Sequence, residues 1–192
     1  MSIAVIAGLG NPGAQYAHTR HNLGFWLVDA LARDSGAAFR NEPRFQSEAT
    51  RVEIAGHATW LLKPQTFMND SGTAVSAFLR FHKIEPKALA VVHDDITLPL
   101  GRMKISERGS DGGHNGLASL IAQLDENFVR VKLGIGAKPH PAMDLAEHVL
   151  SRLLPEEEVV FATRLPDYLA GLKLLVAEGP AAAMNKVNAN KE

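Results

Sequence analysis

A histidine and an asparagine stand just before the first turn of an expected helix, in the stretch TRHNLGFW at residues 19–26. Imidazole takes up a proton near neutral pH, so His21 is a candidate general base that would activate water. A helix N-terminus directly after His21 would disfavour the imidazolium and keep the ring ready to accept a proton. The alternative is structural, with Asn22 capping the helix and His21 a bystander.

Further polar side chains occur where expected strands end and expected helices begin. In open α/β sheets, ligands bind beyond the carboxyl ends of the strands, so these side chains are expected to share one cleft. Each also has a structural explanation, because asparagine and aspartate hold turns and cap helices, as Asn22, Asn69 and Asn115 would. The clusters are Asn11-Pro12-Gly13, Met68-Asn69-Asp70, His93-Asp94-Asp95 and Asp111-Gly112-Gly113-His114-Asn115-Gly116. Clusters at successive strand ends exceed what turn formation requires.

These residue types suit hydrolysis by an activated water molecule. Asp94, within reach of His21, would fix the tautomer of the imidazole and stabilise the positive charge that forms on it. Asparagine amides and backbone N–H groups at helix starts would hold an acyl group and its developing oxyanion. Together they describe cleavage of an acyl ester or amide without a covalent intermediate.

Other kinds of site fit the sequence less well. The stretch GLGNPG at residues 8–13 matches a dinucleotide-binding pattern, but no helix opens within its glycines, and Asp29 lies inside an expected helix instead of ending a strand. The G-x-S-x-G elbow of covalent hydrolases is absent from the sequence. Two alternatives stay open: a metal-dependent hydrolase built on the histidine and aspartate clusters, and a noncatalytic RNA- or nucleotide-binding protein.

The elements that must position these side chains alternate between strands and helices. Continuous apolar runs predict buried strands, and apolar residues at helical spacing predict helices. The expected strands cover 3–9, 45–54, 57–62, 88–93, 102–105 and 129–135, and the expected helices 23–36, 74–79, 117–124 and 143–185, the last broken at Pro166. A hairpin is expected at Ala55-Gly56, and residues 185–192 are expected to fray. We predict a single α/β domain over residues 1–192, with a twisted, mixed, mostly parallel sheet flanked by helices and a helical C-terminal segment.

Length and composition agree with this fold class. A chain of 192 residues with 46% hydrophobic and 21% charged residues is typical of a globular domain with a substantial core. The sequence has no cysteine, which excludes disulfides and thiolate chemistry and fits a reducing compartment. The N-terminal apolar run is too short to span a bilayer and lacks a basic flank, so we expect a cytoplasmic protein without membrane contact.

The charge is unevenly distributed, although the net charge is only −1. Residues 129–140 carry Arg130, Lys132 and Lys138 with no acid, and residues 102–108 are also basic, whereas acids dominate residues 144–178. One region is therefore suited to contact phosphates while another repels them. The alternative is that these are ordinary solvated faces.

Taken in order, the motifs resemble bacterial peptidyl-tRNA hydrolase, from about Ile3 to Glu147. The stretches that carry the resemblance are GLGNPGAQYAHTRHNLGF, KPQTFMNDSG, VVHDDITLPLG, GSDGGHNGL and VRVKLGIG. The resemblance implies a monomeric α/β enzyme without a cofactor. It further implies hydrolysis of the ester between a peptide and the 3′-terminal ribose of tRNA, which releases tRNA from abandoned translation.

The same resemblance implies roles for individual residues. The catalytic base falls on His21, its carboxylate partner on Asp94 and an active-site amide on Asn11. Substrate-binding positions fall on Tyr16, Met68, Asn69, Gly112, His114 and Asn115, and contacts to the tRNA 5′-phosphate on Lys104, Arg108 and Lys132. The chain departs from the family at the phosphate contacts, where Lys132 replaces a frequent arginine and Ser106 a frequent lysine. Lysine offers a point charge instead of a bidentate fork.

Overall fold

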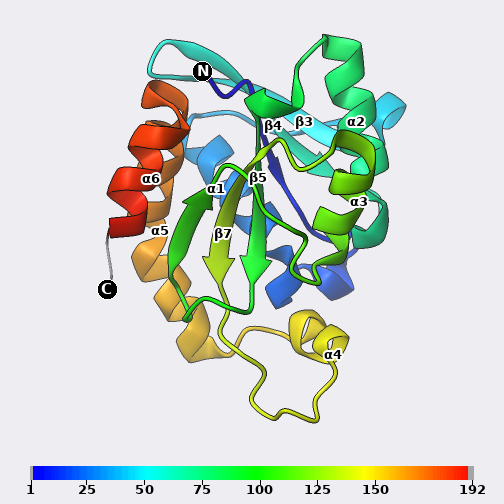
Figure 1. Cartoon of the computed structure of the whole chain (residues 1–192), viewed down its shortest axis with the longest axis vertical. Helices are drawn as coiled ribbons and strands as arrows, with labels where there is room; N and C mark the ends of the chain where they lie inside the picture. The colour runs from blue at the N-terminus through cyan, green and yellow to red at the C-terminus, as the bar shows by residue number, and fades with distance from the viewer. Residues whose placement is uncertain (1, 190–192) are drawn as a thin grey trace.

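The computed structural model describes residues 2–189, which form a seven-stranded sheet in the order β2-β3-β4-β1-β5-β7-β6, flanked by helices (Figure 1). The strands are β1 (Val5–Gly8), β2 (Arg40–Glu42), β3 (Ser47–Ile54), β4 (His57–Pro64), β5 (Leu89–Asp95), β6 (Met103–Ser106) and β7 (Val129–Gly134). The α-helices are α1 (Leu23–Asp34), α2 (Ser71–His82), α3 (Asn115–Leu124), α4 (Leu145–Leu150), α5 (Pro155–Glu178) and α6 (Pro180–Ala189). Short 3₁₀ turns are η1 (Ala14–Tyr16), η2 (Arg20–Asn22), η3 (Pro43–Phe45), η4 (Met68–Asp70) and η5 (Pro86–Ala88).

The centre of the sheet is parallel and its margins are antiparallel. Strand β1 pairs in parallel with β4 and β5, and β5 with β7, whereas β2-β3, β3-β4 and β6-β7 are antiparallel. The predicted α/β class with a mixed sheet is therefore confirmed, but the described sheet is not mostly parallel, since three of its pairings are parallel and three antiparallel. The carboxyl ends of β1, β5 and β7 consequently lie at one edge, where α4 also lies (Figure 1).

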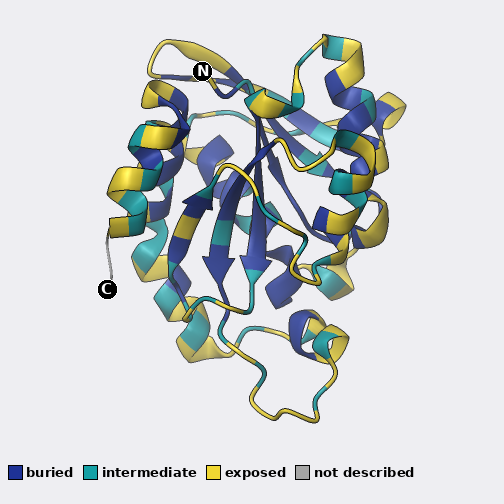
Figure 2. Ribbon diagram, viewed as in Figure 1, coloured by how far each residue is buried: buried dark blue, intermediate teal, exposed yellow. Residues whose placement is uncertain are grey.

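Two hydrophobic clusters hold helices on opposite faces of the sheet, and Figure 2 shows the sheet buried between them. One cluster contains Leu27 and Leu31 of α1, Leu172 and Leu175 of α5 and Ala183 of α6. The other contains Val75 and Phe78 of α2 and Leu117 and Leu120 of α3. Apolar residues at helical spacing thus face the sheet, as the sequence pattern predicted.

The expected hairpin is present and joins β3 to β4 through Ala55 and Gly56. Both residues have positive φ, 50° and 79°, which is the backbone of a tight turn whose twist matches that of the strands. Strand β2, which pairs with β3, was not predicted from the sequence.

The expected break at Pro166 is wrong, because Pro166 lies inside the continuous helix α5. Proline removes the hydrogen bond to the carbonyl four residues earlier, here that of Ala162. Both residues are exposed, while Phe161 and Tyr168 pack in the core on either side. The helical region is instead interrupted at residues 151–154 and at Gly179. No helix within residues 2–189 is both long and apolar enough to cross a membrane.

The expected fraying is also wrong for residues 185–189, which belong to α6. The side-chain amide of Asn188 accepts the Ile105 N–H at 2.8 Å and donates to the Ile105 carbonyl at 2.9 Å. Helix α6 is thereby fastened to β6, the strand at the margin of the sheet. Residues 190–192 lie outside the described part of the chain.

The start of α1 lies against the ends of β1 and β5. A β-carbon at Gly24 would lie 2.4 Å from the Leu9 nitrogen and 2.4 Å from the Val92 carbonyl oxygen, closer than real contacts allow. Only glycine permits this approach. It brings His21, three residues earlier, to the edge of the sheet where Asp94 lies.

Candidate active site

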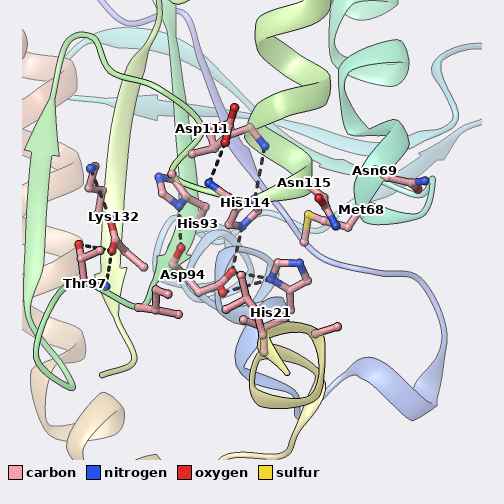
Figure 3. A pocket seen from close by; sticks show the side chains of 18 of the residues that line it. His21, Met68, Asn69, His93, Asp94, Thr97, Asp111, His114, Asn115 and Lys132 are labelled. Atoms are coloured by element: carbon pink, nitrogen blue, oxygen red, sulfur yellow. Dashed lines mark hydrogen bonds and ion pairs between the residues drawn. The ribbon is translucent and has the colours of Figure 1, made fainter. Parts of the chain in front are cut away.

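A cavity of about 620 Å³ opens at the carboxyl ends of the central strands. Its walls come from η2, η4, the end of β5, the loop before α3, and α4 (Figure 3). Of the residues singled out in the sequence, it is lined by Asn11, His21, Met68, Asn69, Asp94, Gly112, His114, Asn115 and Lys132. Segments far apart in the chain thus meet in one cleft, as expected for an open α/β sheet.

The side chains of His21 and Asp94 are paired inside this cavity. His21 Nδ1 lies 2.9 Å and 3.1 Å from the two carboxylate oxygens of Asp94, whose side chain is only 2% exposed. Burial alone would raise the pKa of Asp94, but His21 and His114 beside it hold that pKa well below its usual range. An ionised carboxylate only accepts hydrogen bonds, so His21 Nδ1 is the donor. The lone pair of His21 is therefore on Nε2.

His114 contacts the same carboxylate and lies beside His21 (Figure 3). Its Nε2 lies 3.1 Å from Asp94 Oδ1, and its Nδ1 accepts the backbone N–H groups of Gly116 and Leu117. His114, not Asn115, is therefore the side chain that caps α3.

The third histidine of the site, His93, is almost fully buried beside His114, with the two ring centroids 5.1 Å apart. Its Nδ1 donates to the Asp94 backbone carbonyl at 2.7 Å. Burial and the neighbouring His114 lower the pKa of His93 to about 3, against the opposing effect of Asp94. The ring is accordingly neutral at physiological pH.

Asn22 has a different role from the helix cap expected of it. Its side chain accepts the Asn11 backbone N–H and donates to the Asn11 carbonyl, both at 2.9 Å, and makes no capping bond to α1. Asn11 Oδ1 in turn accepts the Met68 N–H at 2.7 Å. The loops that carry Asn11, His21 and Met68 are thus fastened to one another.

The remaining expected substrate contacts are more exposed. Asn69 lies within η4 and makes no capping bond, and Asn115 is the first residue of α3; both are exposed on the cavity wall. Gly112 has a φ of +58°, which favours glycine in this wall. Tyr16 lies in η1 and is not among the residues that line the cavity.

The basic residues separate into two groups. Lys132 on β7 lines the cavity with its Nζ 3.4 Å from Asp95, and Lys104 is its direct partner on β6, so both point to one face of the sheet. Arg108 is exposed in the loop after β6. Arg130, by contrast, is buried and donates to the carbonyls of Gly109, Glu126 and Phe128, so it holds a loop and does not face solvent.

Some residues of the cavity escaped sequence reasoning. Phe67, a residue that is 60% exposed, lies in the cavity wall beside Met68. Leu145, Val149 and Leu150 of α4 form another wall. An aromatic residue next to Met68-Asn69 was a usable signal for Phe67. The placement of α4 depends on tertiary contacts and left no local pattern.

Within residues 2–189, one group has the spacing of metal ligands: His21, Asp94 and His114, with donor atoms within 4.8 Å of one another. Their protonation fits a metal poorly. His114 Nδ1 accepts two N–H groups, so Nε2 carries the hydrogen of the neutral ring and has no lone pair for an ion.

Comparison with known proteins gives one consistent family. The family model described as "Peptidyl-tRNA hydrolase" matches residues 5–192. A peptidyl-tRNA hydrolase of Chloroflexus aggregans is 46% identical over 186 residues, which cover 96% of this chain and 98% of the relative. One of Acinetobacter baumannii is 39% identical over 192 residues, covering 99% and 98%.

The fold agrees with solved structures as well. The crystal structure of the Acinetobacter baumannii peptidyl-tRNA hydrolase superposes with a TM-score of 0.92 at 38% identity and covers 97% of this chain and 95% of that one. The similarity therefore includes the C-terminal helices, for which sequence motifs were least informative.

Proposed function

The chain belongs to the peptidyl-tRNA hydrolase family, and we propose that it hydrolyses the ester between a peptide, or an N-blocked aminoacyl group, and the 3′-terminal ribose of tRNA. The products are free tRNA and free peptide. The observation that carries the proposal is the pairing of His21 Nδ1 with the buried carboxylate of Asp94, which leaves Nε2 as a base in the cavity. We further propose that the chain works as a cytoplasmic monomer without a cofactor.

The reaction follows from this pair. His21 Nε2 removes a proton from water while the water oxygen forms a bond to the ester carbonyl carbon. Asp94 stabilises the imidazolium that results. When the tetrahedral intermediate collapses, the bond to the ribose oxygen breaks, the electron pair stays on that oxygen, and His21 returns the proton to it.

The asparagines supply the remaining contacts to the substrate. Because Asn11 Oδ1 is occupied by the Met68 N–H, the Nδ2 hydrogens of Asn11 are the part of its amide left to donate to water or to the oxyanion. Asn69 and Asn115, exposed on the wall, would bind the first peptide group. Tyr16, Met68, Gly112 and His114 are retained as proposed neighbours of the peptide, although Tyr16 lies outside the cavity wall.

Contact with the tRNA 5′-phosphate is assigned to Lys132, Lys104 and Arg108. The adjacent positions of Lys104 and Lys132 on one sheet face support a shared phosphate contact next to the cavity. Two ammonium groups attract phosphate without imposing the bidentate geometry of arginine.

The decisive experiment gives purified, chelator-treated protein two substrates in parallel, N-acetyl-aminoacyl-tRNA and free aminoacyl-tRNA. Cleavage of the first and sparing of the second supports the proposal. Binding of both without cleavage would identify a noncatalytic RNA-binding protein.

A metal-dependent hydrolase is the second candidate, favoured by the spacing of His21, Asp94 and His114. Loss of cleavage on chelation, with recovery on adding Zn²⁺, would establish it. Full activity after chelation supports water activation by His21 alone.

A further inference from the structure

His114 is held at both of its ring nitrogens by groups that fix where its hydrogen lies. Nδ1 accepts the N–H groups of Gly116 at 3.1 Å and Leu117 at 3.3 Å, at the first turn of α3. A nitrogen that accepts a hydrogen bond carries no hydrogen, so the single N–H of the neutral ring is on Nε2. The start of α3 therefore selects the tautomer of His114.

That N–H points at the carboxylate that orients His21. His114 Nε2 lies 3.1 Å from Asp94 Oδ1, and His21 Nδ1 lies 2.9 Å from the same oxygen. The centroids of the two imidazole rings are 4.7 Å apart. His21 Nδ1 also lies 3.1 Å from Asp94 Oδ2, so the two histidines together contact both oxygens and hold the carboxylate in one orientation. With His114 removed, the carboxylate is free to turn about its last torsion.

We propose that His114 is a positioning residue for the reaction, which fixes the Asp94 carboxylate so that His21 keeps its hydrogen on Nδ1 and its lone pair on Nε2. The inference rests on the proposed function and gives His114 a task distinct from contact with the peptide. The backbone of α3 orients His114, His114 orients the Asp94 carboxylate, and that carboxylate orients His21.

The replacement His114→Asn separates this task from the helix cap. Asparagine is a favoured N-cap residue, so its side chain still accepts the N–H groups at the start of α3, but it is too short to reach Asp94. We expect the single-turnover rate to fall by about 10- to 100-fold, the size of effect seen when residues that orient metal ligands are lost, with the thermal unfolding midpoint unchanged and KM raised at most through the lost contact to the peptide. In His114→Ala the rate falls equally and the midpoint falls as well, because the cap is also lost.

A raised KM with an unchanged rate in His114→Asn would show that the residue only contacts the peptide, and would overturn the proposal. A fall in rate that merely accompanies a lower unfolding midpoint in the same variant would overturn it too.

A second measurement needs no substrate and therefore stands apart from the proposed function. Nitrogen-15 spectra of the imidazole groups report which nitrogen of His21 carries the hydrogen. We expect the Nδ1–H form in the wild-type chain and in the control His57→Asn, whose histidine is exposed on β4, and a mixture of tautomers in His114→Asn. An unchanged His21 signal in His114→Asn would contradict the proposal even if the enzyme proved fully active.

Discussion

At the scale of single residues, the site depends on a carboxylate that is ionised although almost no water reaches it. Burying a charge is costly unless hydrogen-bond donors replace the lost water. Asp94 receives such donors from His21 and His114. The same contact holds the His21 ring by Nδ1, so one set of hydrogen bonds both stabilises the buried charge and orients the imidazole that we propose as the base.

Removing the base tests the assignment directly. In His21→Ala the proton acceptor is lost while the surface that faces tRNA is unchanged, so we expect the single-turnover rate to fall by at least about 100-fold, with tRNA affinity preserved. Rates are measured with saturating enzyme, and affinity with deacylated tRNA. A fall of less than tenfold would remove His21 from the role of base.

Because His93 is buried with a lowered pKa, we predict that the chain becomes less stable at acidic pH. Its pKa is about 3 in the folded chain and near 6.5 when unfolded, so between these values the unfolded chain binds a proton that the folded chain does not. The free energy of unfolding therefore decreases as the pH falls from 6.5 towards 3, by about 1.4 kcal/mol per pH unit from this residue. His93→Asn should remove that part of the slope in urea unfolding at several pH values, whereas His57→Asn should leave it unchanged.

The roles of single residues could be predicted from sequence where a local pattern marks them, and not where they depend on contacts between distant residues. His21 and Asp94 were found because a strand end and a helix start are local patterns that a parallel sheet brings together. The clamp of Asn22 on Asn11 was missed, because an asparagine before a helix looks like a cap whether or not its side chain turns elsewhere. Arg130 was counted among the basic residues suited to contact phosphates, but its side chain is buried. Counting charges along the sequence cannot detect burial.

At the scale of elements, the segment that carries His21 is hydrogen-bonded to the connection between α4 and α5. The guanidinium of Arg20 donates to Ser151 Oγ, to the Arg152 carbonyl and to Glu157 Oε2, and the Arg20 N–H donates to the Ser151 carbonyl. Glu157 also accepts the Leu154 N–H at the start of α5. Helix α4, a wall of the cavity, is therefore joined to η2 through its own C-terminal end.

The ion pair between Arg20 and Glu157 is predicted to be structurally important. Glu157→Gln keeps the shape of the side chain and an acceptor for α5 but leaves the buried guanidinium without its counter-charge. We expect the free energy of unfolding to fall by about 1–3 kcal/mol in urea titrations. The exposed neighbour Glu158→Gln serves as the control and should change stability by less than about 0.5 kcal/mol. Equal effects of the two substitutions would contradict a special role for the pair.

The elements themselves were largely predictable, because apolar periodicity marks each helix and strand that packs on the core. The errors came where a long-range contact or solvent overruled a local rule. Pro166 is tolerated in α5, where it and Ala162 lie on the exposed side of the helix. Residues 185–189 stay helical with Asn188 bound to β6, a contact across more than 80 positions that no local pattern encodes.

At the scale of the whole molecule, charge is sorted although the net charge is only −1. Lys104, Lys132 and Arg108 lie on β6, on β7 and in the loop that follows β6, next to the cavity, whereas the first turn of α5 carries Glu156, Glu157 and Glu158. Positive charge gathered in this way would favour the approach of a polyanion to β6 and β7.

Replacing Lys132 tests whether these basic residues contact tRNA. In Lys132→Ala we expect weaker tRNA binding and a plot of log affinity against log salt that is shallower by about one unit, because one phosphate contact is lost. Cleavage of a short ester that carries only the terminal nucleoside should be nearly unchanged. Lys173→Ala, on α5 and paired with Asp34, is the matched control. Equal losses on both substrates would place Lys132 in catalysis or folding instead.

At Gly24 the main chain of α1 approaches Leu9 and Val92 so closely that no side chain fits. The position of His21, three residues earlier, therefore depends on this glycine. A methyl group at position 24 would clash with the Leu9 nitrogen and the Val92 carbonyl oxygen, so we expect Gly24→Ala to push the start of α1, and with it His21, away from Asp94. We therefore expect a mutagenesis screen scored on activity to rank Gly24 beside His21, although Gly24 does not line the cavity and bears no reactive group. In this fold, the distance between His21 and Asp94 depends on the lack of a β-carbon at position 24.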